Sequence, residues 1–183
     1  MVTLRLPLPG CVVRSYRPED AAALVRHGDD RRVWRNLRDR FPHPYSHADA
    51  VSWIRQATSD RPEVHFAVAL DGQAVGGIGL ELQSDIHRRS AEIGYWLGAS
   101  CWGRGIATEA VRAVTAYGFS RFELCRIYAL VFEWNPASGR VLEKAGYSLE
   151  GRLRRAVVKE GQVLDAFLYA VVAPGGPAAP PAD

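Results

Sequence analysis

The sequence has few cysteines and no long apolar run. The three cysteines in 183 residues, Cys11, Cys101 and Cys125, lie far apart, without the paired spacing of zinc sites or disulfide frameworks. No apolar stretch approaches the length that spans a bilayer, and the N-terminal segment lacks the apolar core of a signal peptide. We therefore expect reduced cysteines, no metal, no membrane partner and a cytoplasmic location.

Lysine is nearly absent, because Lys144 and Lys159 are the only two. The basic residues are almost all arginine and are scattered along the chain. The 20 acidic residues offset the 23 basic ones and leave a net charge of +3. Nucleic-acid-binding proteins instead gather positive charge in patches. We expect no nucleic-acid partner.

The remaining composition is that of an ordinary globular protein, with 48% hydrophobic and 23% charged residues and no internal repeat. We expect residues 1–173 to form one domain. The last segment, residues 174–183, reads PGGPAAPPAD. Because this segment has almost nothing to bury, it predicts a disordered tail.

Periodic patterns predict an α+β fold with a mixed sheet. Strands are expected at residues 12–16, 65–70, 73–82, 91–97, 126–132, 147–158 and 163–172, with helices near 17–25, within 29–40, and from 46, 106 and 135. Asp71-Gly72 is a hairpin turn. Because a helix connects the strands at 91–97 and 126–132, the crossover rule makes them parallel, while the other strands are antiparallel.

A glycine-rich turn between a strand and a helix is the most informative segment. Gly98, Gly103 and Gly105 follow the strand at 91–97, and apolar residues recur at helical spacing from Ile106 onward. Such a junction presents unpaired backbone N–H groups at the positive end of the helix dipole, and glycine lets a ligand approach them. The segment therefore predicts a phosphate site.

Two familiar phosphate motifs do not fit this turn. Gly98 and Gly103 have the spacing of a P-loop, but Arg104 and Gly105 stand where that motif needs Lys and then Ser or Thr. The dinucleotide fingerprint G-x-G-x-x-G also fails, because Thr108 stands at its third glycine position.

The turn resembles the acetyl-CoA pyrophosphate loop of the GNAT superfamily of N-acyltransferases. That pattern is Gln or Arg, two residues, Gly, one residue, then Gly or Ala, and Trp102, Gly105 and Ala107 occupy the three positions. Trp102 departs from the general pattern. This departure resembles the branch that contains the ribosomal-protein N-terminal acetyltransferases RimJ and RimL.

A second segment strengthens the resemblance. Asn135-Pro136-Ala137-Ser138, followed by Glu143-Lys144-Ala145-Gly146-Tyr147, resembles the family's N-x-x-S and K-x-G-[FY] motifs. Asn135 also suits a helix N-cap, Pro136 the first helical position and Gly146 the C-terminal stop. The resemblance covers residues 12–172. It implies the GNAT acyl-CoA N-acyltransferase fold, with a central splayed pair of parallel strands, antiparallel flanking strands and helices on both faces.

The resemblance implies acetyl-CoA as co-substrate, without a metal. The backbone of Trp96 and Leu97 would pair with the pantetheine arm, Asn135 would bond the same arm, and Ser138 would assist the departing thiolate. The pyrophosphate would be wrapped by Trp102, Gly103, Arg104, Gly105, Ile106, Ala107 and Thr108. Helix capping is the alternative role for Asn135 and Ser138, and a solvated loop position is the alternative for Arg104.

The general base does not follow from the RimL resemblance. The Glu assigned as base in RimL-type enzymes falls at Val157 in this chain. Other family members place a Glu on the central strand, within a residue of Glu92, and a carboxylate inside an apolar strand needs a partner or a task. Glu92 is the candidate catalytic base, with a structural ion pair as its alternative.

Amine chemistry favours an α-amine acceptor. At about pH 7.5, roughly a quarter of an α-amine is neutral but only about 0.1% of a lysine side chain. A site without a firmly assigned base therefore suits a protein N-terminus, in agreement with the RimJ and RimL resemblance. Trp34, Arg38 and Tyr45 are the candidate substrate-binding residues.

Two alternatives for function stay open at this level. One is acetylation of a small amine, such as an antibiotic or a polyamine. The other is a non-catalytic acyl-CoA-binding regulatory module. For either kind of acetyltransferase the partner is an amine-bearing acceptor, and a homodimer is also left open.

Overall fold

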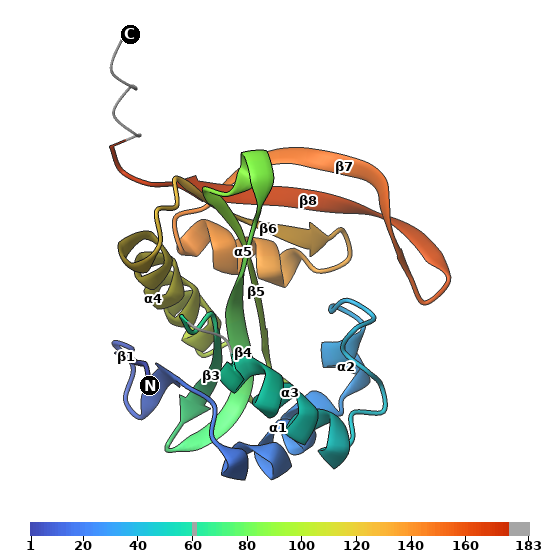
Figure 1. Ribbon diagram of the computed structural model, residues 1–183. Helices are drawn as coiled ribbons and strands as arrows, with labels where there is room; N and C mark the ends of the chain where they lie inside the picture. The colour runs from blue at the N-terminus through green and yellow to red at the C-terminus, as the bar shows by residue number, and fades with distance from the viewer. Residues whose placement is uncertain (60–61, 176–183) are drawn as a thin grey trace, which may run out of the picture.

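The computed structural model describes residues 1–59 and 62–175, and its centre is a single mixed sheet (Figure 1). The strands are β1 (Thr3–Arg5), β2 (Cys11–Arg14), β3 (His65–Leu70), β4 (Gln73–Leu82), β5 (Ser90–Leu97), β6 (Arg126–Phe132), β7 (Ser148–Lys159) and β8 (Gln162–Val172). The helices are α1 (Ala21–Gly28), α2 (Arg31–Trp34), α3 (His47–Ser59), α4 (Ile106–Arg121) and α5 (Pro136–Lys144). The strand order is β1-β2-β3-β4-β5-β6-β8-β7.

The parallel pair at the centre of the sheet separates soon after it begins. β5 and β6 are paired only at residues 90–92 of β5, while every other neighbouring pair of strands is antiparallel. Beyond Glu92, β5 stays paired with β4, and β6 stays paired with β8. One edge of β5 from residue 93 to 97 therefore faces a gap. This confirms the predicted splayed pair and the mixed α+β class.

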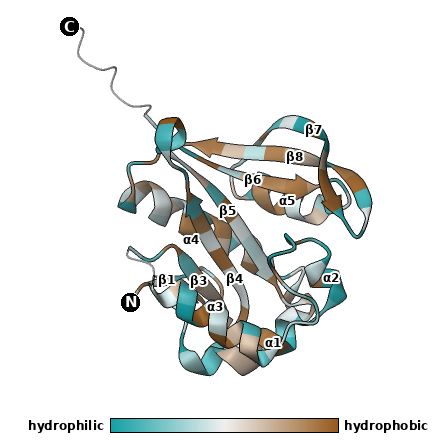
Figure 2. Cartoon of the chain, turned by 45° about the vertical axis from the view of Figure 1, so that its right-hand side comes forward, coloured by the Kyte–Doolittle hydropathy of each residue, from teal (hydrophilic) through white to brown (hydrophobic). Residues whose placement is uncertain are grey.

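Each face of the sheet buries its own hydrophobic core, so the predicted helices on both faces are also confirmed. α4 and α5 cover one face, where Val111, Val114 and Leu142 are fully buried. α1 and α3 cover the other, where Leu24 and Ile54 are buried. In Figure 2 much of β8 is hydrophobic, whereas hydrophilic segments lie along the outer parts of several helices.

Alternation along β5 decides which side chains face which core. Tyr95 and Leu97 belong to the core beneath α4 and α5. Trp96 packs instead against the core beside α1 and α3. Because successive side chains of a strand point to opposite faces, Glu92 shares the face of Trp96. The two faces of this strand therefore carry different candidate groups.

The N-terminal strand was not predicted. β1 alternates in burial but contains only three residues, which is too short a run to predict a strand, and its presence depends on pairing with β2. β2 itself begins and ends earlier than the predicted strand at 12–16. In the predicted tail, residues 176–183 lie outside the described residues. Among the helices that are described, none is both long enough and apolar enough to cross a membrane.

Both ends of α5 follow the predicted sequence signals. The Asn135 Oδ1 atom accepts a hydrogen bond from the backbone N–H of Ser138 at 3.3 Å, and Pro136 is the first helical residue. After the helix, Gly146 has a φ of 96°, in the left-handed region. The capping residue thereby places Ser138 in the first turn, beside the gap in the sheet.

Gly146→Ala is expected to lower the free energy of unfolding by about 1 kcal/mol, because an added Cβ disfavours left-handed backbone. Space is not the cause, since apart from residues 145–147 no heavy atom of the described residues lies within 4 Å of the position that the added Cβ would take. Urea unfolding should show a lower midpoint with an unchanged slope. Gly151→Ala in β7 is the matched control, because that position is also open but lacks a positive φ. Equal losses in both variants would contradict the backbone explanation.

Candidate active site

A large cavity occupies the gap between β5 and β6 and reaches both faces of the sheet. Its volume is about 1480 Å³, above the roughly 300–1,000 Å³ of ordinary small-molecule pockets. The lining includes the turn before α4, the first turn of α5, and the connector between α2 and α3. The cavity therefore has room for two substrates that meet in the gap.

The turn before α4 presents a row of free backbone donors. Gly103 and Gly105 have φ values of 74° and 77°, and Gly105 is the N-cap of α4 without a capping side chain. Within the described chain, no protein acceptor takes the backbone N–H groups of residues 103–108, and the first helical bond is Glu109 N–H to Gly105 O at 3.1 Å. Free donors at the positive end of a 16-residue helix suit a phosphate.

Trp102 anchors this turn to the end of β5. Its Nε1–H donates to the carbonyl oxygen of Leu97 at 2.8 Å, and about half of its side chain is exposed. The Leu97 carbonyl that was predicted to face the pantetheine arm thus already accepts one hydrogen bond. Ile106 points into the core and is 2% exposed, so it can contribute to the turn only through its backbone. Ala107 and Thr108 line the cavity.

Charges in the cavity lining are divided unevenly between paired and unpaired groups. All four lining carboxylates have partners in the described structure: Asp39 pairs with Lys159, Asp49 with Ser46, Glu81 with Arg38 and Arg40, and Glu92 with Arg38. Three lining cations, Arg104, Arg140 and Lys144, make no side-chain hydrogen bond or ion pair with described residues. Beside α4 and α5 the unpaired charge is therefore positive, which suits an anionic ligand, whereas Asp49, whose partner Ser46 is neutral, lies on α3.

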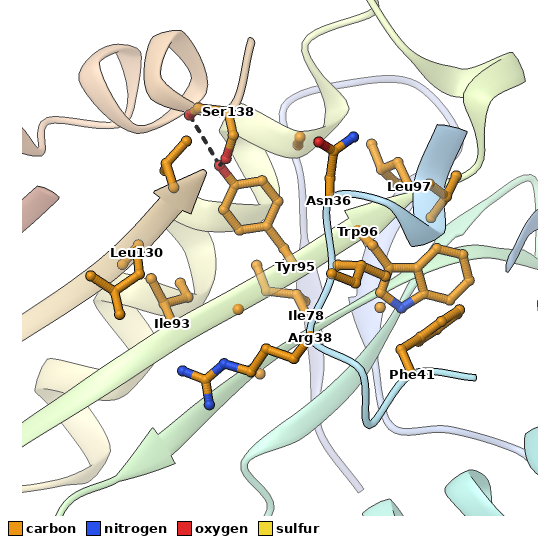
Figure 3. A pocket seen from close by; sticks show the side chains of 18 of the residues that line it. Asn36, Arg38, Phe41, Ile78, Ile93, Tyr95, Trp96, Leu97, Leu130 and Ser138 are labelled. Carbon is orange, nitrogen blue, oxygen red and sulfur yellow. Dashed lines mark hydrogen bonds between the residues drawn. The ribbon is translucent and has the colours of Figure 1, made fainter. Parts of the chain in front are cut away.

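Ser138 has a partner that the sequence did not reveal. The Tyr95 Oη and Ser138 Oγ atoms are 2.7 Å apart, and Figure 3 shows Tyr95 pointing toward Ser138. Burial raises the pKa of Tyr95 far above its ordinary value, so its phenol stays protonated. A hydroxyl-bearing aromatic at an inward position, between Ile93 and Leu97 of β5, was the signal that could have identified it.

Glu92 lies on the opposite face of β5 and is held in an ion pair. Arg38 donates a hydrogen bond to its Oε1 atom, and only 15% of the Glu92 side chain is exposed. Glu81 stands directly across from Glu92 on β4 and is bound by Arg40 at 2.9 Å. The structural ion pair considered from the sequence is therefore present, and its carboxylate also lines the cavity. Arg38 contacts the candidate base instead of standing free for an acceptor.

Trp34 is not brought to the cavity, unlike Arg38 and Tyr45. The Lys159 Nζ atom lies 3.8 Å from the centre of the Trp34 ring, and His43 stacks on the same ring. Tyr45 is 4% exposed and stacks on Phe41, with ring centres 4.5 Å apart. Phe41, which is not among the residues predicted from the sequence, also packs edge-on against Trp96, so it forms part of the aromatic wall opposite Ser138 (Figure 3).

The residues in the cavity fit a CoA thioester. A diphosphate matches the free N–H groups of 103–108, and the pantetheine arm, which carries amides, matches the unpaired edge of β5 at 93–97. The Ser138 hydroxyl lies beside this edge, 2.7 Å from the Tyr95 hydroxyl. The backbone donors, the open strand edge and this hydroxyl thus line one cavity.

Comparisons with known proteins agree with this fit. The Acetyltransferase (GNAT) domain family matches residues 11–148. The uncharacterized N-acetyltransferase YoaA of Bacillus subtilis (strain 168) is 41% identical over 102 residues, which are 56% of this chain and 57% of YoaA. Spermidine N(1)-acetyltransferase of Escherichia coli (strain K12) is 32% identical over 132 residues, 72% of this chain and 70% of that protein.

Among solved structures, Mycobacterium smegmatis RimJ in complex with CoA-disulfide superimposes with a TM-score of 0.81 and 29% identity, covering 94% of this chain and 86% of RimJ. The predicted family and co-substrate are thereby confirmed. The chain belongs to the GNAT family of acetyltransferases, which are acyltransferases that use acetyl-CoA.

Proposed function

We propose that the protein transfers the acetyl group of acetyl-CoA to the α-amine of a peptide or protein N-terminus. The observation that carries this choice of acceptor is that three of the four carboxylates in the described cavity lining are already paired with cationic side chains, and the fourth, Asp49, accepts hydrogen bonds from Ser46. A polyamine is a multiple cation and needs unpaired carboxylates to hold its distant ammonium groups. A neutral α-amine has no such need.

The co-substrate is held by the groups already described, in the roles that the resemblance implied. Backbone donors of the turn, namely Gly103, Arg104, Gly105, Ile106, Ala107 and Thr108, bind the diphosphate, and Trp102 keeps the turn in place. The free edge of β5 at Trp96 and Leu97, together with Asn135, binds the pantetheine arm. Arg104 adds a charge-assisted contact to phosphate. Residues 1–173 act as one domain in this proposal.

The amine attacks the thioester directly, and Glu92 removes its proton through water. Glu92 and Tyr95 are three residues apart on β5, about 10 Å at ~3.3 Å per residue, and they face opposite sides of the strand. The proton therefore leaves on the acceptor face, away from sulfur. Arg38 already holds the Glu92 carboxylate in an ion pair, so the site suits an acceptor amine that is partly neutral before it binds. An α-amine meets this condition better than lysine.

The names of the relatives support both kinds of acceptor, since one is a spermidine N(1)-acetyltransferase and another, YdaF of Bacillus subtilis (strain 168), is a putative ribosomal N-acetyltransferase. The test is thiol release measured with three acceptors: a peptide with a free N-terminus, the same peptide with a blocked N-terminus and an internal lysine, and spermidine. We expect the free N-terminus to have the highest kcat/KM by at least about tenfold, because more of it is neutral. Its kcat/KM should rise with pH and level off near about pH 8.

A higher kcat/KM with spermidine than with the peptide N-terminus would contradict the proposed acceptor and support a small amine in its place. Binding of CoA without turnover of any of the three amines would support the non-catalytic module instead. Calorimetry with CoA separates these results from a misfolded preparation, since the folded protein binds CoA in each case.

A further inference from the structure

Tyr95 is a buried phenol whose hydroxyl reaches the first turn of α5. Besides the contact with the Ser138 Oγ atom at 2.7 Å, its Oη–H can donate to the Ser138 carbonyl oxygen at 3.2 Å. In the described structure the Tyr95 hydroxyl forms hydrogen bonds with no residue other than Ser138. Both residues line the cavity, on the face of β5 away from Glu92. The pair is therefore placed to act together on a group in the gap.

Two neighbouring tyrosines have partners elsewhere. The Tyr147 hydroxyl is 2.7 Å from the Thr115 Oγ1 atom, and the Tyr169 hydroxyl donates to Glu143 at 3.4 Å. Neither Tyr147 nor Tyr169 lines the cavity. Among these three tyrosines, only Tyr95 both lines the cavity and forms a hydrogen bond with Ser138.

The Ser138 hydroxyl can present its hydrogen to only one acceptor at a time. While Tyr95 donates to the Ser138 carbonyl, the Ser138 hydroxyl donates to Tyr95. When Tyr95 instead donates to the Ser138 Oγ atom, the Ser138 hydrogen is free for another acceptor in the cavity. A thioester sulfur is a weak acceptor and a thiolate is a strong one, so the second arrangement is favoured as the C–S bond breaks.

We propose that Tyr95 is a positioning residue that donates to the Ser138 Oγ atom and thereby directs the Ser138 hydroxyl to the sulfur of the departing CoA thiolate. This inference rests on the proposed function. When the tetrahedral adduct collapses, the C–S bond breaks and its electron pair goes to sulfur. The Ser138 hydroxyl donates a hydrogen bond to that thiolate and keeps its proton, because an alkoxide is a far stronger base than a thiolate. The proton of the amine leaves by way of Glu92 and water, and CoA is protonated later by solvent.

This chain of two hydrogen bonds is stronger in the transition state than in the ground state, so it raises kcat. Losing a donor that contacts the developing charge costs about 10²–10³ in kcat. Tyr95 does not contact the developing charge itself. It contributes only by strengthening the hydrogen bond from Ser138 to the thiolate. Tyr95→Phe is therefore expected to lower kcat by about tenfold, with little change in the KM for acetyl-CoA.

The test combines kinetics with binding of two ligands that differ only at sulfur. Tyr95→Phe, Ser138→Ala and the double variant are compared with Tyr169→Phe, a control that removes a hydroxyl outside the cavity. In the Ser138→Ala background, Tyr95→Phe should cause no further loss of kcat. Wild-type protein should bind CoA more tightly than desulfo-CoA at about pH 9.5, where most of a thiol is ionised. Tyr95→Phe should reduce this preference without weakening desulfo-CoA.

Losses of kcat that multiply in the double variant, or an unchanged preference for CoA in Tyr95→Phe, would overturn the inference and leave the proposed function intact. Failure of the wild type to bind either ligand would overturn both. Wild-type kcat in Tyr169→Phe, together with the expected losses in Tyr95→Phe, supports a role that depends on the sulfur and not on packing.

Discussion

Replacing Glu92 with glutamine is expected to lower kcat/KM by about 10²–10³, within the range of general-base catalysis. The carboxylate takes the proton of the attacking amine through water, and an amide of the same shape cannot. The glutamine would still offer its side-chain carbonyl oxygen to Arg38, and Arg38 would keep Glu81 at 3.4 Å, so the local structure should survive. Thiol release at about pH 7 measures the effect, and calorimetry should show unchanged affinity for CoA.

Glu81→Gln is the matched control for this prediction. Glu81 stands opposite Glu92 in the sheet and shares Arg38, but its side chain is 44% exposed compared with 15% for Glu92. We expect kcat/KM to stay within about threefold of wild type, because exposed ion pairs contribute little. Equal losses in the two variants would mean that the ion pairs, and not a base at Glu92, support activity.

Ala107→Glu is expected to weaken the binding of CoA at least about 100-fold, or roughly 2.7 kcal/mol. Ala107 is the second residue of α4 and lines the cavity beside the free N–H groups. A carboxylate there would accept those hydrogen bonds itself and would repel the diphosphate. Isothermal titration calorimetry with CoA measures the change directly.

The free energy of unfolding of Ala107→Glu should stay the same or rise while its affinity for CoA falls. A loss of binding in this variant therefore cannot be attributed to misfolding. A negative side chain in the first turn of a helix stabilises it by about 0.3–1 kcal/mol. Ala107→Glu should therefore unfold at the same or a higher urea concentration than wild type. Ala107→Gln, equal in size but neutral, should lose far less affinity for CoA. Similar losses in both variants would indicate steric obstruction, and full affinity in Ala107→Glu would contradict the assignment of the diphosphate to this turn.

Much of the fold could be predicted because it depends on local patterns. β3, β4 and β6 have the expected bounds, and the turn at Asp71-Gly72 joins β3 to β4. The parallel direction of β5 and β6 followed from the helix between them. β1 was missed because an alternating run of three residues is too short to predict a strand, and this edge strand depends on pairing with β2.

The candidate site was predicted only in part, for a related reason. The turn at 98–105 and the capped start of α5 are continuous segments whose glycine, proline and asparagine positions have direct backbone consequences. Tyr95 was overlooked because its significance arises from Ser138, 43 positions away in the sequence. Trp34 was selected because it lies in a helix expected near the acceptor, but its ring packs against Lys159 and lies outside the cavity.

The sequence by itself determined the order of the elements, the strand edge beside a glycine turn and the family to which the chain belongs, since these depend on neighbouring residues. Only the tertiary structure decided which charges are free. Arg38 reaches Glu92 across 54 positions, and Lys159 reaches Asp39 across 120. Electrostatic interaction depends on distance in space and on burial, and neither can be read from separation along the chain.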